Sequence, residues 1–242
     1  MSTVSLSVTA ITPHGVVLSR PWGIPLDALL ASVVWHRRKR DAMEAGGYLK
    51  YRPEEPQEIL ELPLARCGDP NADDDWHWMS TFADLHPQTG HTLEPDIRWR
   101  TSRTNRARLQ QLAPTISGRV SDRAGRYQRR VVPVMAHPAT HLTWRAVGDP
   151  ECIREMLTEL PSIGPNRGVG EGVVSRWEVT EEPSLDQWEA GHEHAPGVLG
   201  RTTPLRCIGE TPSCEVGVFD VASIRPPYLH RDSRTRAFHP AR

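Results

Sequence analysis

The chain has 242 residues, a formal net charge of -1 and 38% hydrophobic residues, so it is long enough to bury a core. Its 22 prolines and 18 glycines indicate many turns and long loops, which argues against a compact helical bundle. No apolar run approaches the length of a membrane span and no secretory leader is recognisable. We therefore expect a cytoplasmic protein without a membrane partner.

The N-terminal residues predict a strand followed by a helix. Residues 4–12 alternate apolar and polar side chains, as in a half-buried strand. Pro25 suits the first helical position, and Asp27 complements the positive end of the helix dipole. Apolar residues then recur at helical spacing, which predicts a helix over residues 25–42. The four basic residues 37–40 fall in its last turns, where either solvation or RNA contact would explain them.

A second group of elements is predicted near residue 140. Residues 141–147 alternate like a strand, and Asp149 with Pro150 forms a typical helix start before an apolar stripe at residues 150–160. Residues 172–180 again alternate like a strand. Between the two groups, residues 46–130 lack regular periodicity. We therefore expect a single domain over residues 1–242, interrupted by an arginine-rich insertion at 46–130.

The basic residues of the chain are unevenly distributed. Residues 98–130 contain ten arginines and one acidic residue, Asp122, so this segment is strongly positive in a nearly neutral chain. Arginine binds phosphate in a bidentate manner, and the nearby Trp99 and Tyr127 could stack on bases. A solvated basic loop is the alternative. The predicted RNA-binding arginines are Arg98, Arg100, Arg103, Arg106, Arg108, Arg119, Arg123, Arg126, Arg129 and Arg130.

A glycine-rich segment, GPNRGVGEG, follows the second predicted helix. Glycines permit positive φ and a close approach of a ligand to the main chain, so backbone amides could face phosphate oxygens. Dinucleotide and Walker loops instead lie between a strand and the following helix, which argues against a nucleotide-binding fold. An ordinary flexible turn remains the alternative. The candidate RNA-binding residues here are Gly164, Arg167, Gly168, Gly170 and Gly172.

Metal-binding and catalytic motifs are not evident in the sequence. The four cysteines, at positions 67, 152, 207 and 214, show no CxxC spacing, which predicts free thiols. The pairs His137/His141 and His192/His194 are expected to be surface histidines, because no further ligand completes a set. The three carboxylates at 73–75 are expected to form a solvated acidic turn. We therefore expect no metal, no cofactor and no catalytic residues.

Four segments together resemble a known family. They are the first strand, PWGIPLDALLASVVWHR, GPNRGVGEGVVSRWEV and IRPPYLHRD. The chain is similar over residues 4–43 and 141–230 to the RAMP superfamily of CRISPR proteins, and most similar to the Cas-five-like subunit of type IV effector complexes. Pro25 to Ala31 match a motif of that family, with Ala28 in place of a glycine. The resemblance implies an α+β fold with a ferredoxin-like, RRM-like core and a loop-rich, thumb-like insertion.

The resemblance also implies a function in antiviral defence. Such a subunit is not an enzyme; it binds and caps the 5′ handle of the guide crRNA and contacts the Cas-seven-like backbone subunits, with target nucleic acid as a further candidate partner. Cas-six-like relatives instead process precursor crRNA without metal, for which His14, His36, Tyr48 and Lys50 are the positions to inspect. A protein interaction scaffold that binds no RNA is the third possibility.

Overall fold

The computed structural model of the protein describes most of the chain. The described residues are 3–19, 23–49, 52, 54–56, 58–87, 90, 92, 94–102, 105–112, 121, 123, 127–165 and 170–241, without the side chains of Arg106, Gln110 and Leu112. The fold is mixed, with antiparallel sheets and few helices. No helix in these ranges combines the length and the apolar composition that crossing a membrane requires.

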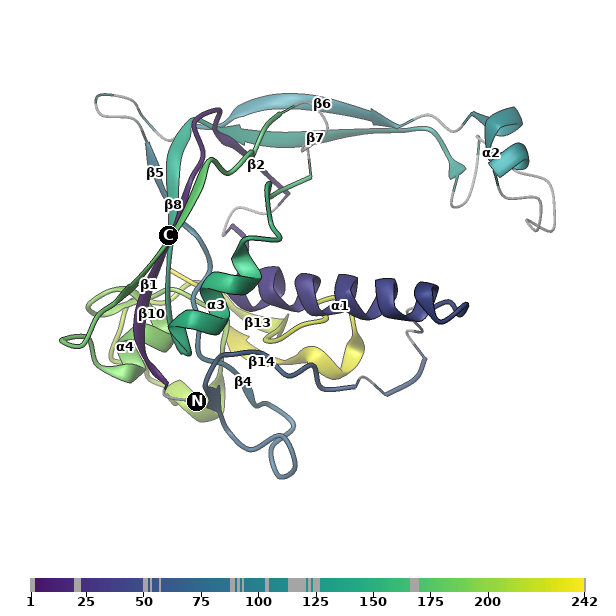
Figure 1. Ribbon diagram of the computed structural model, residues 1–242. Helices are drawn as coiled ribbons and strands as arrows, with labels where there is room; N and C mark the ends of the chain where they lie inside the picture. The colour runs from purple at the N-terminus through teal and green to yellow at the C-terminus, as the bar shows by residue number, and fades with distance from the viewer. Residues whose placement is uncertain are drawn as a thin grey trace.

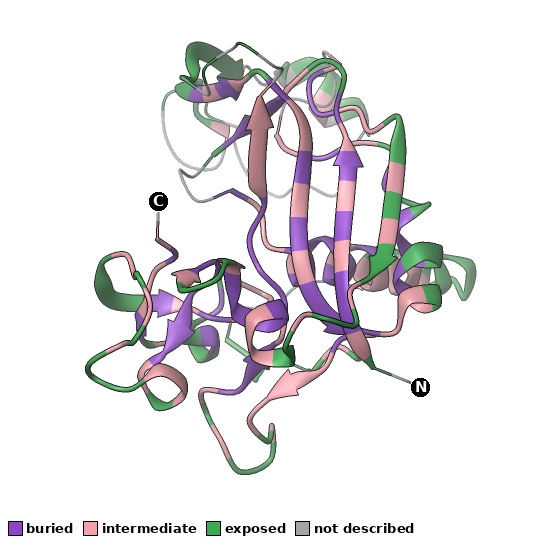
Figure 2. Cartoon of the chain, turned by 90° about the vertical axis from the view of Figure 1, so that its left-hand side faces the viewer, coloured by how far each residue is buried: buried purple, intermediate pink, exposed green. Residues whose placement is uncertain are grey.

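A four-stranded antiparallel sheet, here called the central sheet, lies on the left in Figure 1, with the two helices that connect its strands and a long projecting hairpin to its right. Its order is β5-β8-β1-β9. The strands are β1 (Val4–Ile11), β5 (Asp84–Pro87), β8 (Ala139–Gly148) and β9 (Arg176–Glu181). Three of them were predicted, with ends that differ by up to four residues. In Figure 2 the strands stand side by side, and buried residues alternate along the central ones.

Two helices connect the strands of this sheet. Helix α1 (Leu26–Glu44) lies between β1 and β5 in the chain, and α3 (Pro150–Leu157) lies between β8 and β9. Asp149 caps α3 as predicted, because its side chain accepts hydrogen bonds from two backbone amides of the first turn. Pro25 is the residue before α1 rather than its first residue. Both predicted helices are thus confirmed, with shifted ends.

The main core lies between the sheet and these two helices. Every second residue of β1 and β8 is buried there, which is why the sequence alternates in these strands. Trp144 of β8 is almost fully buried, and its indole N–H donates to the carbonyl oxygen of Ile24 at 2.8 Å. The core residues from these elements include Leu6, Val8, Ala10, Leu26, Leu30, Val33, Leu142, Trp144, Ala146, Ile153 and Leu157.

Residues 46–130 were expected to form an insertion. Part of this region packs in the main core, and only the later part projects from it. Leu62, Leu64, Trp76 and Trp78 are buried in the main core, and β5 pairs with β8. A short hairpin of β3 (Arg66–Cys67) and β4 (His77–Trp78) precedes β5. These apolar side chains pack on the core because that removes them from water. The part that projects begins after residue 94.

The projecting part is a long hairpin, here called the arm. It consists of β6 (Asp96–Ser102), α2 (Arg106–Leu112) and β7 (Arg130–His137). Its base is a three-stranded sheet in which β7 pairs with both β6 and β2 (Val16–Leu18). Val17, Val134 and Ala136 form a small core at this base. Figure 1 shows β6 and β7 running outward past α1, with α2 at the far end.

The last quarter of the chain packs against the other end of the central sheet. Helix α4 (Gln187–His192) contacts β8 and β1, and the hairpin of β10 (Glu193–Ala195) and β11 (Val198–Leu199) follows it. A three-stranded sheet has the order β12-β14-β13. Its elements are β12 (Thr203–Pro204), α5 (Leu205–Ile208), β13 (Phe219–Ser223), the 3-10 helix η3 (Arg231–Ser233) and β14 (Arg234–Phe238).

Candidate nucleic-acid interface

The two strands of the arm present two chemically different faces. Residues paired across an antiparallel ladder share a face, and successive residues alternate between faces. Ile97, Trp99 and Val131 therefore lie on one face, where their side chains are 63%, 66% and 53% exposed. Arg100 and Arg130 lie on the opposite face. The arm thus combines an exposed apolar face that carries Trp99 with a face that carries arginines.

Most described arginines of the predicted tract are solvent-exposed. Arg100, Arg108, Arg123, Arg129 and Arg130 are all exposed. None of the five has an acidic partner within 4 Å among the described residues. Exposed cations without acidic partners are available to bind an anion. The remaining predicted arginines, Arg103, Arg119 and Arg126, lie outside the described residues, as does the side chain of Arg106.

Arg98 differs from the other arginines of the tract. Its guanidinium forms ion pairs with Asp96, at 3.1 Å, and with Glu171. Glu171 lies between Gly170 and Gly172, so this contact joins the arm to the glycine-rich loop, here residues 164–172. The structure therefore brings the two predicted RNA-binding segments together. The charge of Arg98 is therefore partly neutralised, and its side chain links β6 to the glycine-rich loop.

The described glycines of the loop adopt the positive φ that was predicted. Gly164, Gly170 and Gly172 have φ of 83°, 88° and 76°. A Cβ atom at Gly164 would lie 2.5 Å from the carbonyl oxygen of Val17, so this glycine allows close packing on β2. The amide of Gly172 donates to the carbonyl of Gly15 at 2.9 Å.

These contacts correct part of the prediction that backbone amides of the glycine-rich loop face phosphate oxygens. The amide of Gly172 is satisfied within the protein and does not face a phosphate, because the loop packs against the β1–β2 turn. Gly164 likewise serves the packing of the backbone. Arg167 and Gly168 lie outside the described residues.

A groove of about 300 Å³ lies at the base of the arm. Three carboxylates line it, those of Glu94, Asp96 and Glu171, together with Arg98 and His14. Carboxylates repel phosphate oxygens, so this groove is poorly suited to a nucleic-acid backbone. The positive potential of the arm lies farther out along the strands.

The basic end of α1 takes part in ion pairs on the surface. Arg37 and Arg40 both contact Glu159, at 2.6 Å and 3.0 Å, and Arg38 contacts Glu58 at 2.7 Å. Two of these pairs join α1 to the residues after α3. Their charges are therefore largely compensated, which distinguishes them from the exposed arginines of the arm.

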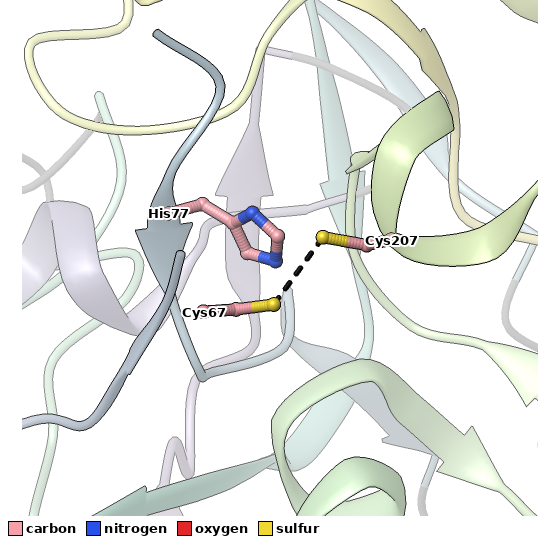
Figure 3. A group of neighbouring side chains, drawn as sticks. All are labelled: Cys67, His77 and Cys207. Atoms are coloured by element: carbon pink, nitrogen blue, oxygen red, sulfur yellow. Dashed lines mark hydrogen bonds between the residues drawn. The ribbon is translucent and has the colours of Figure 1, made fainter. Parts of the chain in front are cut away.

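A cluster of cysteine and histidine side chains was missed by the sequence analysis. Cys67, His77 and Cys207 place their ligand atoms within 4.8 Å of one another (Figure 3). The two sulfur atoms are 3.2 Å apart, and Nε2 of His77 lies 3.0 Å from Nε2 of His192. His192 was expected at the surface but is fully buried. No spacing motif could reveal the cluster, since its members come from four separate elements.

Burial dominates the electrostatics of this cluster. Loss of hydration lowers the pKa of His77 to about 3, with a further contribution from the charge of Arg201, and burial also lowers the pKa of His192. Contact with Cys207 lowers the pKa of Cys67, and the same contact raises that of Cys207. The two imidazoles are therefore neutral near pH 7.

The other predicted positions are not gathered into a site of this kind. His141 stacks on His86 with ring centroids 4.5 Å apart, and His86 contacts the hydroxyl of Thr143. His14, His36 and Tyr48 are exposed, and Lys50 lies outside the described residues. The acidic turn at 73–75 is not only solvated, because Asp75 forms an ion pair with Arg206 at 2.7 Å.

Comparison with known proteins adds no relative. No protein-family model matches this chain, and no curated protein sequence matches it.

Proposed function

We propose that the protein is a non-catalytic subunit of a type IV CRISPR ribonucleoprotein, which binds and caps the 5′ handle of the guide crRNA in the cytoplasm and contacts the backbone subunits. The proposal rests on the resemblance in sequence and on one structural observation. That observation is the arm, in which the exposed arginines other than Arg98 have no acidic partner among the described residues.

The arrangement of the core supports the proposal. The four strands of the central sheet and its two helices occur in the chain order β1, α1, β5, β8, α3, β9, which is the βαββαβ order of a ferredoxin-like core, with β2, the β3–β4 hairpin and the arm inserted between them. The antiparallel sheet places the first and third of these strands, β1 and β8, at its centre. We therefore propose a ferredoxin-like, RRM-related core, from which the arm projects as the thumb-like insertion of RAMP proteins.

The two faces of the arm suit single-stranded RNA. Guanidinium groups bind phosphate oxygens and stack on bases, and an exposed indole offers a platform for an unpaired base. Arg100 and Arg130 lie on one face of the ribbon and Trp99 on the other, so a strand of RNA that wraps the arm meets both. This is the kind of contact that recognises unpaired RNA rather than a duplex.

Salt-dependent binding tests the proposal. Each phosphate contact on a single strand contributes about -0.7 to the slope of log affinity against log salt. A variant with five exposed arginines of the arm replaced by alanine should bind the handle RNA more weakly, with a slope flattened by up to about 3.5. The replaced residues are Arg100, Arg108, Arg123, Arg129 and Arg130.

A matched variant controls for net charge. Five arginines of the body that form surface ion pairs, Arg37, Arg38, Arg40, Arg52 and Arg154, are replaced by alanine. This variant carries the same change in charge but should keep the wild-type affinity and slope. Equal losses in both variants would contradict a site on the arm. In the same samples, the RNA should stay intact without metal; cleavage would favour the processing enzyme.

Preference for the handle separates a guide-binding subunit from general RNA binding. The handle RNA should bind more tightly than a scrambled RNA of equal length and composition. Purification together with the products of neighbouring genes, followed by sequencing of the bound RNA, should recover repeat-derived guides. Recovery of no RNA would favour the interaction scaffold.

A further inference from the structure

Four separate elements deliver the cluster of cysteines and histidines. Cys67 in β3 and His77 in β4 are direct partners across the short hairpin, His192 ends α4, and Cys207 lies in α5. The lack of a side chain at Gly191 lets α4 lie close to Met79, since a Cβ atom at this position would be 2.9 Å from Cβ of Met79. The fold therefore brings the ligand atoms of Cys67, His77 and Cys207 within 4.8 Å of one another from regions up to 140 residues apart, and His192 adjoins them through Nε2 of His77.

The two imidazole rings are oriented so that the Nε2 atoms face each other and each Nδ1 atom faces a backbone carbonyl oxygen. Nδ1 of His192 lies 3.0 Å from the carbonyl oxygen of Trp188, and Nδ1 of His77 lies 3.4 Å from that of Asp75. A carbonyl oxygen only accepts, so Nδ1 carries the proton in both rings. Both Nε2 atoms then present lone pairs to each other at 3.0 Å. Such an arrangement is unfavourable unless a cation binds both.

We propose that Cys67, His77, His192 and Cys207 form a structural zinc site, with two thiolate and two imidazole ligands. For tetrahedral zinc, Zn–S bonds of about 2.3 Å place two sulfur atoms about 3.8 Å apart, and Zn–N bonds of about 2.0–2.1 Å place two nitrogens about 3.3–3.4 Å apart. The observed separations are 3.2 Å for the sulfur atoms and 3.0 Å for the nitrogens. A small expansion therefore accommodates the ion between Cys67, His77 and Cys207, and His192, which lies outside their 4.8 Å grouping, completes the set by moving toward it.

The ligand set favours zinc over other common divalent ions. Magnesium and calcium prefer oxygen ligands, whereas two thiolates with two imidazoles are typical of structural zinc. Carbonyl oxygens at both Nδ1 atoms supply the outer contacts that orient ligating histidines, and Trp188 stacks on His192 at 3.8 Å. Four protein ligands leave no open position, so the site is structural rather than catalytic.

The site would fasten the last quarter of the chain to the β3–β4 hairpin. The sheet of β12, β13 and β14 has a small core of its own, made of Ala222, Ile224 and Ala237. So small a core provides little stability by itself, and small folds commonly depend on a metal or another cross-link. Zinc held jointly by the hairpin, α4 and α5 would supply that cross-link. This role is independent of RNA binding.

Metal analysis tests the site directly. Wild-type protein purified under reducing conditions should contain one zinc per chain. After removal by a chelator, titration with cobalt(II) should give the visible absorption of tetrahedral cobalt with thiolate-to-metal charge transfer, which zinc then abolishes. Cys67→Ser with Cys207→Ser should lose both signals. Cys152→Ser with Cys214→Ser, which changes the two cysteines outside the cluster, should keep them.

Other outcomes would overturn the site. Wild-type protein that binds no cobalt, or binds it without tetrahedral absorption, contradicts it whether or not the serine variants fold. Wild-type protein that was never treated with a chelator and holds a Cys67–Cys207 disulfide instead of zinc also contradicts it; alkylation without reductant and mass spectrometry detect that bond. Retention of stoichiometric zinc by the folded Cys67→Ser, Cys207→Ser variant would place the ion elsewhere.

Discussion

The arm and the cysteine–histidine cluster place their polar side chains in opposite ways. In the arm, the described arginines of one continuous segment remain exposed to water, and all except Arg98 lack acidic partners among the described residues. In the cluster, two buried imidazoles and two half-buried thiols from four elements face one another. Exposed charges cost the fold little, whereas buried polar groups must be satisfied internally. This difference underlies the two proposals, an external ligand for the arm and an internal ligand for the cluster.

The largest expected effect concerns stability and sharpens this comparison. Replacing Cys67 and Cys207 by serine removes two ligands of the proposed zinc site, which should cost at least about 3 kcal/mol and lower the melting temperature by roughly 6–12 °C. The five-arginine variant of the arm should melt within about 2 °C of the wild type, because those side chains are exposed. Differential scanning calorimetry at saturating zinc measures both. Equal destabilisation of the two variants would contradict this difference between the arm and the cluster.

Asp27 provides a second buried group whose effect depends on pH. It is fully buried, and burial raises its pKa to about 6, although the charge of Arg201 and a hydrogen bond from Tyr228 oppose the shift. The folded protein therefore binds a proton that the unfolded chain has lost between about pH 4 and 6. Stability from this group is complete below pH 4 and falls as pH rises to 6, by roughly 2–3 kcal/mol.

Substitution of Asp27 isolates that contribution. Asp27→Asn keeps the shape of the side chain but cannot ionise. The unfolding free energy of this variant should therefore lack the fall between pH 4 and 6 that Asp27 causes. The difference between variant and wild type, measured by urea unfolding at pH 4 and pH 7, should shift by roughly 2–3 kcal/mol in favour of the variant. Tyr228→Phe, which removes the hydrogen-bonded hydroxyl but leaves the carboxyl, should retain the fall. A constant difference for Asp27→Asn across this range would show that Asp27 does not titrate there.

The smallest expected effect separates stacking from charge on the arm. Trp99→Ala should weaken the binding of handle RNA by the loss of one stacked base, about 1–3 kcal/mol, while the salt slope stays unchanged because no charge is removed. Trp99→Phe should recover most of the affinity. Fluorescence anisotropy at several salt concentrations measures both quantities. Unchanged affinity in Trp99→Ala would mean that the apolar face of the arm does not contact RNA.

Local sequence patterns were sufficient for the main elements of the core. Alternation predicted β1, β8 and β9 because their buried faces line one core, and helical spacing with Asp149 and Pro150 predicted α3. The edge strand β5 was not predicted. It is short, and its residues are only half-buried, so it carries no clear alternation. Its place in the sheet depends on pairing with β8 rather than on its own sequence.

The sequence by itself determined the features that depend on neighbouring residues: the alternating strands, the amphipathic helices and the concentration of arginines in one segment. Only the tertiary structure decided which polar groups meet. It paired Arg98 with Glu171, committed the amide of Gly172 to Gly15, and brought Cys67 and His77 to His192 and Cys207. Such contacts join residues far apart in the chain, and their positions follow from the packing of whole elements, which no local pattern encodes.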